Sequence, residues 1–552
     1  MFNLGKGSGE VDQSGEGDSA QAKEFILEAL KTGVSNQKEM QALKNRYCLK
    51  YKSTPFTNVE LIKAYRSLLS EGAIDDQPDF MKLLRKRGVR SKSGIASVTV
   101  ITKHYACPGT CIFCPNEPKM PKSYLSNEPA VMRAILNDFD AYRQTRNRLE
   151  SLEISGHHTD KIDMIVSGGT FSYYPRDYQE EFTLGIFRAL NSESRYPIGG
   201  SGKAKTLENE QLFNETAKHR CIGLSFETRP DYVNEEEIIN LRRLGCTKIE
   251  IGVQSLNDEV LELNRRGHGV AETRRAFQLL RDAGFKINAH MMPNLYGSNM
   301  ENDLNDFREL FENPAYKPDW LKIYPCMVVP WSELAKVYER GEYKPYSDDE
   351  LTDLIIRLKQ IVPEYCRITR LYRDIPAPTV LGGCKISNLR QLVHAKMGKM
   401  GIECRCIRCR EIKDEKIDGS RVELRVQEFE ASGGREFFIS FDDTEKDKLC
   451  SLLRLRFTSY ALKGEPHFIK ELEGASIIRE VHTYGEQVRV AASSADGASQ
   501  HVGLGRRMIA EAERISKDAG FKKIAVISGI GVREYYRKLG YELMGTYMVK
   551  EL

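Results

Sequence analysis

The sequence predicts an α/β protein with a partial parallel (β/α) barrel followed by a smaller α+β domain. Short apolar segments alternate with helical segments between residues 95 and 372, which is typical of a parallel sheet covered by helices. Two Cys-rich segments stand out: the first lies within this pattern and follows directly on a predicted strand, and the second lies after the pattern ends. A composition break at EFEASGGREF then marks the start of the second domain near residue 430.

The first 92 residues are predicted to be a tail followed by helices. Residues 1–20 are rich in Gly, Ser and acidic residues and lack the apolar stretch of a secretory signal, so we expect a flexible tail. Residues 21–92 are expected to form a basic helical region, because apolar residues recur every three to four positions in AQAKEFILEALKTG and TNVELIKAYRSLLSEG.

Residues 93–383 are expected to form the barrel. Its strands are predicted at 95–102, 162–167, 221–227, 247–253, 286–292, 319–325 and 366–372. Two intervening helices begin with capping-box spacing, Asn234 with Glu237 and Ser347 with Glu350. Such barrels place their chemistry at the C-terminal strand ends, so CPGTCIFC and SGGT, each after a strand, are expected on one face.

The C-terminal third is predicted to be a connector followed by a second domain. Residues 384–427 are the Cys- and Arg-rich connector, and residues 428–552 the α+β domain. In that domain we expect strands at REFFISF, ASIIREVHTYG and KKIAVISG, and helices at EKDKLCSLLRLRF, HVGLGRRMIAEAERISKDAG and VREYYRKLG.

Composition narrows the class of protein. Hydrophobic residues make up 41% of the 552 residues and charged residues 29%, as in a globular protein, and no apolar run approaches the ~20 residues of a membrane span. Six of the thirteen cysteines lie in two tight clusters, which favours metal binding over a disulfide scaffold. We therefore expect a cytoplasmic protein without a membrane partner.

The net charge of +4 is unevenly distributed. Residues 82–92 hold six basic residues and no acid, and residues 385–413 hold eight basic residues and two acids. These runs contribute +12, so the remaining chain sums to −8. Two solvated surfaces are the simple interpretation, and a polyanion such as nucleic acid is the functional one.

The first cysteine cluster, CPGTCIFC, predicts an iron–sulfur site. Cys107, Cys111 and Cys114 can hold three corners of a 4Fe-4S cluster and leave one iron open. This spacing, with an aromatic residue before the third cysteine, is typical of radical S-adenosylmethionine (SAM) enzymes, in which SAM binds the open iron. The alternative is a zinc site completed by His104 or by a remote residue.

The segment SGGT after the next strand is expected to meet the amino group of SAM. Its small residues let the backbone approach the ligand, although a GG pair can also be a simple turn. The expected contacts are Gly168, Gly169 and Thr170.

A Gly-rich turn in the C-terminal domain predicts a second cofactor site. Gln500, Gly503 and Gly505 stand between a strand and a helix, the arrangement in which GNAT acetyltransferases bind the pyrophosphate of coenzyme A. The following ISGIGVREYYRKLGYE resembles the closing half of that fold, with Tyr536 expected beside the thioester. The alternatives are a loop without function and core aromatic residues.

The second cysteine cluster, ECRCIRCRE, predicts zinc. Cys404, Cys406 and Cys409 supply three ligands, with His394 preferred over Cys384 as the fourth. Free thiols or a second iron–sulfur cluster are the alternatives, and the flanking arginines would place the site against a phosphate backbone.

Barrel, connector and GNAT-like domain in this order resemble the catalytic subunit family of Elongator. The resemblance extends from about residue 80 to the C-terminus and rests on a large set of motifs. They include LLRKRGVRSKSGIASVTVITK, CPGTCIFCP, SYLSNEPAVMRA, SGGTFSYYP, LSFETRPDYV, EIGVQSLNDEVL, NRRGH, RDIPAP, SNLRQLV, CRCIRCRE and REVHTYG.

The resemblance implies an activity and site residues. A radical made from SAM would abstract hydrogen from the methyl group of acetyl-CoA, and the acetyl radical would add to carbon 5 of the wobble uridine of tRNA. Thioester hydrolysis would then leave a carboxymethyl group. Lys161 and Tyr536 are the implied catalytic residues, and the implied acetyl-CoA contacts are Lys161, Glu480, Val481, His482, Thr483, Ser499, Gln500, His501 and Tyr536.

Departures from the family pattern point to a bacterial or archaeal member. The chain has CPNEP where CPGGP is frequent and Thr483 where valine is usual. The short gap between Cys107 and Cys111 and the retained second cluster differ from eukaryotic members. Such members can act without other Elongator subunits, so tRNA is the expected partner, and a homodimer stays open.

Three other functions are weighed against this one. A protein lysine acetyltransferase of histone type, with a structural iron–sulfur barrel, would need a general base such as Glu480 and no SAM. An RNA-binding module would bind tRNA in a salt-sensitive manner without turnover. Radical methylthio transfer would normally require a further Cys-bearing N-terminal domain, and that region offers only Cys48.

Overall fold

The computed structural model describes residues 15–51, 55–84, 95–195, 206–413, 415, 419–484 and 503–552. The chain divides into two compact units, residues 1–91 with 148–159, and residues 92–147 with 160–552. Three sets of predictions fall outside the described residues: the tail up to residue 14, the basic stretch 85–92, and the site residues Ser499, Gln500 and His501.

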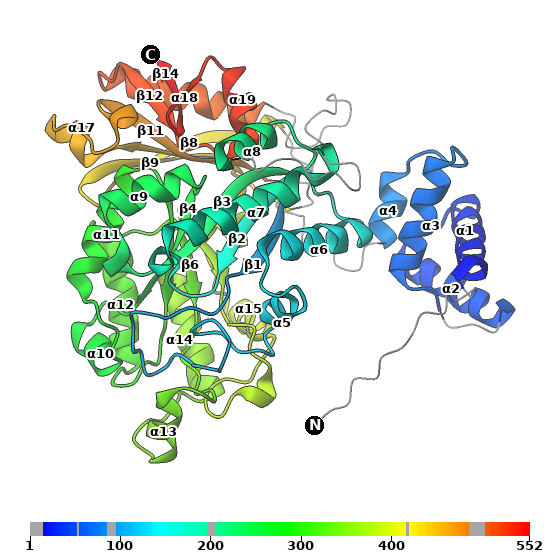
Figure 1. The fold of residues 1–552 in the computed structure, drawn as a ribbon, viewed down its shortest axis with the longest axis horizontal. Coiled ribbons are helices and arrows are strands. Elements are labelled where there is room, and N and C mark those ends of the chain that lie inside the picture. The colour runs from blue at the N-terminus through cyan, green and yellow to red at the C-terminus, as the bar shows by residue number, and fades with distance from the viewer. Residues whose placement is uncertain are drawn as a thin grey trace. The chain divides into compact units, whose positions relative to one another are not determined.

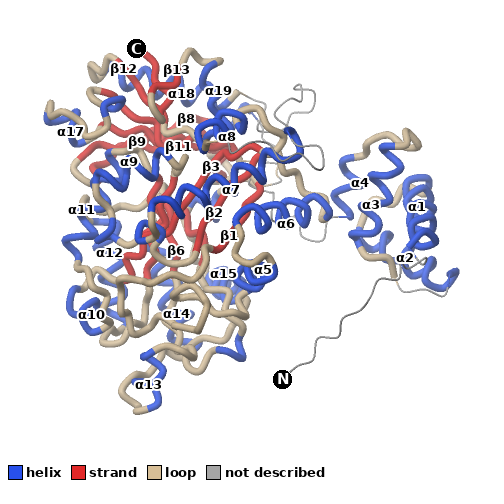
Figure 2. The backbone as a smooth tube through the Cα atoms, in the orientation of Figure 1, coloured by secondary structure: helices blue, strands red, loops and turns tan. Residues whose placement is uncertain are grey.

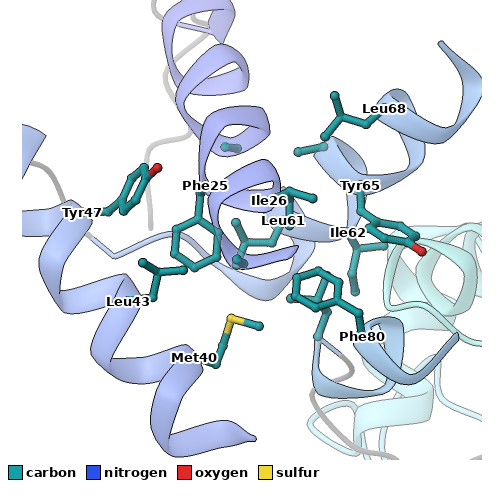
Figure 3. Packing of buried hydrophobic residues seen from close by; sticks show 14 residues of the cluster. Phe25, Ile26, Met40, Leu43, Tyr47, Leu61, Ile62, Tyr65, Leu68 and Phe80 are labelled. Atoms are coloured by element: carbon teal, nitrogen blue, oxygen red, sulfur yellow. The ribbon is translucent and has the colours of Figure 1, made fainter. Parts of the chain in front are cut away.

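The N-terminal unit is helical, as predicted. Its helices are α1 (Gly15–Lys31), α2 (Gln37–Tyr51), α3 (Asn58–Ser70) and α4 (Pro78–Leu84). The first helix begins at Gly15, inside the segment expected to be a tail. Apolar side chains at helical spacing meet in one core, where the rings of Phe25 and Tyr47 lie 5.1 Å apart (Figure 3).

Seven parallel strands in chain order form the first sheet, as predicted. They are β1 (Ala96–Ile101), β2 (Lys161–Ser167), β3 (Arg220–Thr228), β4 (Lys248–Gln254), β5 (Lys286–Met291), β6 (Trp320–Ile323) and β7 (Arg367–Arg370) (Figure 1). Because all seven run the same way, their C-terminal ends share one edge of the sheet. The Ser347 capping box forms as expected at the start of α14, while Asn234 caps α9 by accepting from the Glu237 N–H.

Helices connect these strands along the chain. They are α5 (Pro129–Leu136), α6 (Ala141–Ile154), α7 (Arg176–Arg195), α8 (Leu207–Asn214), α9 (Glu235–Arg243), α10 (Asp258–Leu263), α11 (Val270–Asp282), α12 (Met300–Glu312), α13 (Glu333–Glu339) and α14 (Asp348–Ile361). The connector that follows holds α15 (Leu389–Lys399) and α16 (Ile407–Arg410). Among the described helices, none combines the length and the apolar composition that a bilayer-spanning segment needs.

A second sheet of seven strands follows, in the order β13-β14-β12-β11-β10-β9-β8 (Figure 2). Its strands are β8 (Val422–Ala431), β9 (Gly434–Asp443), β10 (Lys448–Phe457), β11 (Ala475–Thr483), β12 (Lys523–Val526), β13 (Glu542–Met544) and β14 (Tyr547–Glu551). Helices α17 (Ser459–Lys463), α18 (Leu504–Asp518) and α19 (Arg533–Arg537) accompany it. Among the described strands of this sheet, only β11 and β12 pair in parallel, and α18 lies between them in the chain.

Two predictions for this region are wrong. The segment EKDKLCSLLRLRF is strand β10, not a helix. Its leucines at 449, 452 and 453 have helical spacing, but its arginines at 454 and 456 alternate and find buried acidic partners across the sheet. The second sheet also begins before residue 428, because β8 pairs with β9 from Val422 onward.

The two sheets of the larger unit pack closely together. A Cβ atom at Gly531 would lie 2.4 Å from the Cβ of Arg220, the first residue of β3. One at Gly529 would lie 2.1 Å from the Ile222 carbonyl oxygen. The second sheet and its helices therefore contact the N-terminal end of β3, at the edge opposite the cysteine loop.

Candidate functional site

The first cysteine loop follows β1 and is held from both sides. The Ile112 N–H donates to the Asn264 carbonyl oxygen at 3.2 Å, and its own carbonyl accepts from the Leu334 N–H at 2.8 Å. Cys111 is buried, whereas Cys107 and Cys114 are partly exposed. His104 hydrogen-bonds to the Met120 carbonyl oxygen at 2.7 Å, so its Nδ1 atom is engaged away from the cysteines.

Two arginines give this loop a cationic surrounding. The Arg266 Nη1 atom lies 3.5 Å from the Cys111 sulfur. A hydrogen bond from Cys114 and the charges of Arg266 and Arg229 lower the pKa of the Cys111 thiol to about 5, although burial opposes this. Such surroundings favour the thiolate, which is the form that binds metal.

Three buried polar atoms beside the loop have no hydrogen-bond partner among the described residues. They are Arg229 Nη1, Arg266 Nε and His268 Nε2. The rest of the Arg229 guanidinium is held by Asp231 at 2.8 and 2.9 Å. A Cβ atom at Gly109 would lie 2.0 Å from Arg229 Nη1, so only glycine fits inside the loop there. Buried, unpartnered guanidinium donors next to three thiols suit an anionic metal cluster and its carboxylate-bearing ligand.

The SGGT segment is organised by a carboxylate that the sequence did not single out. Glu227, near the end of β3, accepts hydrogen bonds from Ser167 Oγ at 2.9 Å and from the Gly168 N–H at 3.2 Å. It also accepts from the Tyr124 hydroxyl at 2.8 Å. Gly168 has a φ of 137° and Gly169 a φ of 107°, conformations that favour glycine.

The predicted SAM contacts therefore lie on the expected edge of the sheet. A Cβ atom at Gly168 would lie 1.9 Å from the Thr102 hydroxyl, so the loop packs against the end of β1 that leads to the cysteines. Thr170 is buried at the end of the same loop. Glu227, Arg229, Arg266 and His268 were missed as site residues, although all four stand in the quoted motifs LSFETRPDYV and NRRGH.

Lys161 lies at the opposite edge. It is the first residue of β2, next to Arg220 of β3, so the strand separates it from the cysteine loop by about 20 Å at ~3.3 Å per residue. Burial, together with the charge of Arg220, lowers its pKa against the opposing charge of Asp160. Lys161 therefore lies at the edge of the first sheet that contacts the second sheet.

The predicted acetyl-CoA contacts Glu480 to Thr483 are consecutive residues of β11, and Glu480 lies near Lys286 at this edge. Glu480 is buried, and Val481, His482 and Thr483 are partly buried. Glu480 accepts from Arg454 Nε at 2.8 Å and lies 3.9 Å from Lys286 Nζ. Burial opposes ionisation, but these two cations hold the pKa of Glu480 below its usual range.

Of the Gly-rich turn, Gly503 and Gly505 lie among the described residues, at the start of α18. Gly503 has a φ of 71° and caps that helix, and a Cβ atom at Gly505 would lie 3.1 Å from the Tyr535 hydroxyl and 3.9 Å from Thr483 Oγ1. The structure thus brings Thr483, Gly505 and Tyr535 together. Tyr536 is buried, with its ring 5.3 Å from that of Tyr535 and 5.8 Å from that of Tyr541.

The second cysteine cluster is compact. The sulfur atoms of Cys404, Cys406 and Cys409 lie within 4.8 Å of one another, and His394 Nε2 lies 4.0 Å from the Cys409 sulfur. Hydrogen bonds from Cys404 and Cys409 hold the pKa of Cys406 well below its usual value, although burial opposes this. Cys384 is not part of this group of ligand atoms within the described residues.

The basic run 385–413 is largely engaged within the protein. Arg410 is buried against Asp442 at 2.6 Å, and Arg405 contacts Glu364 and Asp447. Lys396 pairs with Asp353 at 2.6 Å. These basic residues are therefore paired with acidic residues of the protein, and Arg410 is not part of the solvated surface that the simple interpretation expected.

Comparisons with known proteins agree with this geometry. A model of the radical SAM superfamily matches residues 101–310, and a model of the radical SAM C-terminal domain matches residues 318–399. A tRNA uridine(34) acetyltransferase of Methanocaldococcus infernus is 44% identical over 501 residues, covering 88% of this chain and 91% of that protein. Elongator complex protein 3 of Homo sapiens is 41% identical over 490 residues, covering 86% of this chain and 87% of that protein.

A solved structure is similar over most of the chain. Archaeal Elp3 of Methanocaldococcus infernus, with an N-terminal deletion, matches with a TM-score of 0.71 at 41% identity. The match covers 83% of this chain and 100% of that one. The parallel sheet described above is thus a radical SAM half-barrel.

Proposed function

The chain belongs to the Elongator complex protein 3 family, and on that premise we propose that it adds a carboxymethyl group to carbon 5 of the wobble uridine of tRNA. The radical SAM half-barrel implies a 4Fe-4S cluster and SAM. The observation that carries the proposal is the cysteine loop beside the unpartnered donors of Arg229 and Arg266. Cys107, Cys111 and Cys114 would hold the cluster, which with SAM supplies a 5′-deoxyadenosyl radical.

The second sheet and its helices would form a GNAT-type domain that binds acetyl-CoA. Gly503 and Gly505 open α18, a helix of 15 residues whose N-terminal N–H groups suit a pyrophosphate. Lys161, Glu480 to Thr483, and Tyr536 would contact the remainder of the cofactor, with Ser499, Gln500 and His501 from the turn.

A zinc ion at the second cysteine cluster is part of the proposal. Three mutually close thiols, with the His394 imidazole 4.0 Å from the Cys409 sulfur, could supply the four ligands of a closed tetrahedral site. Replacing His394 with alanine is expected to reduce bound zinc well below the wild-type content of about one ion per chain and to lower the thermal stability, because a ligand is lost. Elemental analysis of purified protein measures this.

Cys384→Ala is the matched control for the zinc site. Cys384 is a buried cysteine of the same connector, but its carbonyl accepts from the Tyr372 hydroxyl at 3.3 Å and it stands apart from the cluster. We expect it to retain full zinc. Loss of zinc in the Cys384 variant, with retention in the His394 variant, would reverse the assignment.

A lysine acetyltransferase is the second candidate, and the geometry disfavours it. That reaction needs a general base to deprotonate the substrate amine. Glu480 is engaged by Arg454 at 2.8 Å and its pKa is held below the usual range, so it is a weak base. This candidate also leaves the cationic surrounding of the cysteine loop without a function.

The decisive experiment combines anaerobically reconstituted protein with SAM, acetyl-CoA, dithionite and unmodified tRNA. We expect 5′-deoxyadenosine and, after digestion of the tRNA, carboxymethyluridine by mass spectrometry. Release of 5′-deoxyadenosine without modified uridine would support the radical chemistry but contradict tRNA uridine as the substrate. CoA release with acetylated protein and no 5′-deoxyadenosine would support the acetyltransferase instead.

A further inference from the structure

A buried histidine–carboxylate pair lies inside the half-barrel, outside the residues assigned so far. His290 Nε2 on β5 lies 3.0 Å from Glu250 Oε2 on β4, and Lys322 on β6 contacts the same carboxylate. The side chain of Glu250 is 2% exposed and that of His290 13%. By strand alternation, Ile249 and Ile251 point to the other face of the sheet, so this polar group occupies the interior.

The pair is close to the cysteine loop. His290 is in register with Gly252 on the neighbouring strand. Arg266 Nη2 donates to the Gly252 carbonyl at 2.5 Å, and Arg266 Nη1 lies 3.5 Å from the Cys111 sulfur. The imidazole is thus linked to the cysteine loop through two residues, Gly252 and Arg266.

The protonation state of the His290 imidazole suits a general base. Burial and the charge of Lys322 lower its pKa below the usual value, although Glu250 opposes this, so the imidazole is neutral at pH 7. If Nε2 carries the proton shared with Glu250, Nδ1 is the basic atom. Nδ1 has no hydrogen-bond partner among the described residues.

The proposed reaction requires a base in this location. Joining the methyl carbon of acetyl-CoA to uridine leaves a CoA thioester attached to the uracil ring, and water must cleave this thioester to yield the carboxylate. The thioester carbonyl is bonded to the carbon that the radical attacked, so it stays near the cysteine edge. Glu480 on β11 belongs to the second sheet and Tyr536 to its accompanying helix α19, and this part of the protein contacts the opposite edge.

We propose that His290, oriented by Glu250, is the general base for hydrolysis of the CoA–carboxymethyluridine thioester. This inference rests on the proposed function. His290 takes a proton from water as the oxygen attacks the carbonyl carbon. The tetrahedral intermediate then expels the CoA thiolate, which takes the proton back from the imidazolium and leaves as CoA–SH. Glu250 is the positioning residue.

The test uses a synthetic anticodon stem–loop that carries the CoA thioester of carboxymethyluridine, with reconstituted protein and without SAM or dithionite. This bypasses the radical steps, and free CoA is measured. We expect wild-type protein to release CoA and His290→Gln to be slower by about 100-fold, the lower limit of general-base contributions. His290→Asn serves as the second variant should glutamine disturb folding, which circular dichroism monitors.

Tyr324→Phe is the matched control. Its ring lies 5.8 Å from that of His290 but is not part of the pair with Glu250, so hydrolysis should stay at the wild-type rate. In the complete reaction, His290→Gln should form 5′-deoxyadenosine and accumulate a CoA-linked uridine that hydroxylamine converts to a hydroxamate. Wild-type rates of CoA release in a folded His290 variant, or no hydrolysis by wild-type protein, would overturn the inference. Absence of modified uridine in the complete wild-type reaction would instead count against the proposed function.

Discussion

Replacing Cys111 with alanine is expected to abolish both 5′-deoxyadenosine formation and uridine modification. Cys111 is the most deeply placed thiol of the loop, and hydrogen bonding from Cys114 with the nearby arginines lowers its pKa to about 5. A 4Fe-4S cluster held by three thiolates loses a required ligand when one is removed. The measurement is iron content and the visible spectrum after reconstitution, together with 5′-deoxyadenosine by chromatography.

Cys221→Ala controls for the loss of a buried thiol. Cys221 is a buried cysteine on β3 whose sulfur donates to the Gly223 carbonyl at 3.4 Å, and burial raises the pKa of its thiol. This variant should keep its iron and its activity. A Cys111 variant with wild-type iron content and 5′-deoxyadenosine would contradict the assignment of the first cluster.

Replacing Asp319 with asparagine is expected to destabilise the larger unit by about 3–5 kcal/mol, the cost of breaking a buried ion pair. Asp319 precedes β6 and is 1% exposed. Its carboxylate accepts from Arg479 at 2.6 and 2.9 Å and lies 3.4 Å from Arg454. Because both arginines belong to the second sheet, the substitution removes a negative charge where the two sheets meet and leaves Arg479 with Glu436 and Arg454 with Glu480 as carboxylate partners. Denaturant unfolding measures the change.

Asp374→Asn is the surface control for this network. Asp374 pairs with Arg370 at 2.7 Å, but its side chain is 64% exposed. Exposed pairs contribute only about 0–1 kcal/mol, so its unfolding midpoint should hardly move. Equal effects of the two substitutions would show that the buried network does not hold the sheets together.

The same network predicts a dependence on pH. Burial opposes ionisation of Asp319, but Arg479, Arg454 and Arg281 hold its pKa well below the usual range. A carboxylate with a depressed pKa contributes stability above its unfolded pKa of about 3.9, and that contribution is lost as pH falls through the folded pKa. Below about pH 4 the wild-type free energy of unfolding should therefore fall more steeply than that of Asp319→Asn. Unfolding titrations between pH 3 and 6 compare the slopes.

Sequence patterns predicted the barrel well and the second domain less well. The seven barrel strands are short apolar segments separated by helices, so their local composition agrees with the tertiary fold. Strand β10 failed because Leu449, Leu452 and Leu453 imitate a helical face. What makes the segment a strand is the acidic partners of Arg454 and Arg456, which come from distant parts of the chain.

The sequence by itself predicted the candidate metal ligands of the two cysteine clusters, because metal ligands within one short loop are local and their spacing can be counted. Only the tertiary structure decided what surrounds them. Arg266 stands 155 residues from Cys111, and Glu250 stands 40 residues from His290. A parallel sheet brings such residues together, because successive strands place their corresponding ends at one edge whatever the length of chain between them. Distance along the chain therefore carries no information about these contacts, and the cationic site and the interior pair emerged only with the fold.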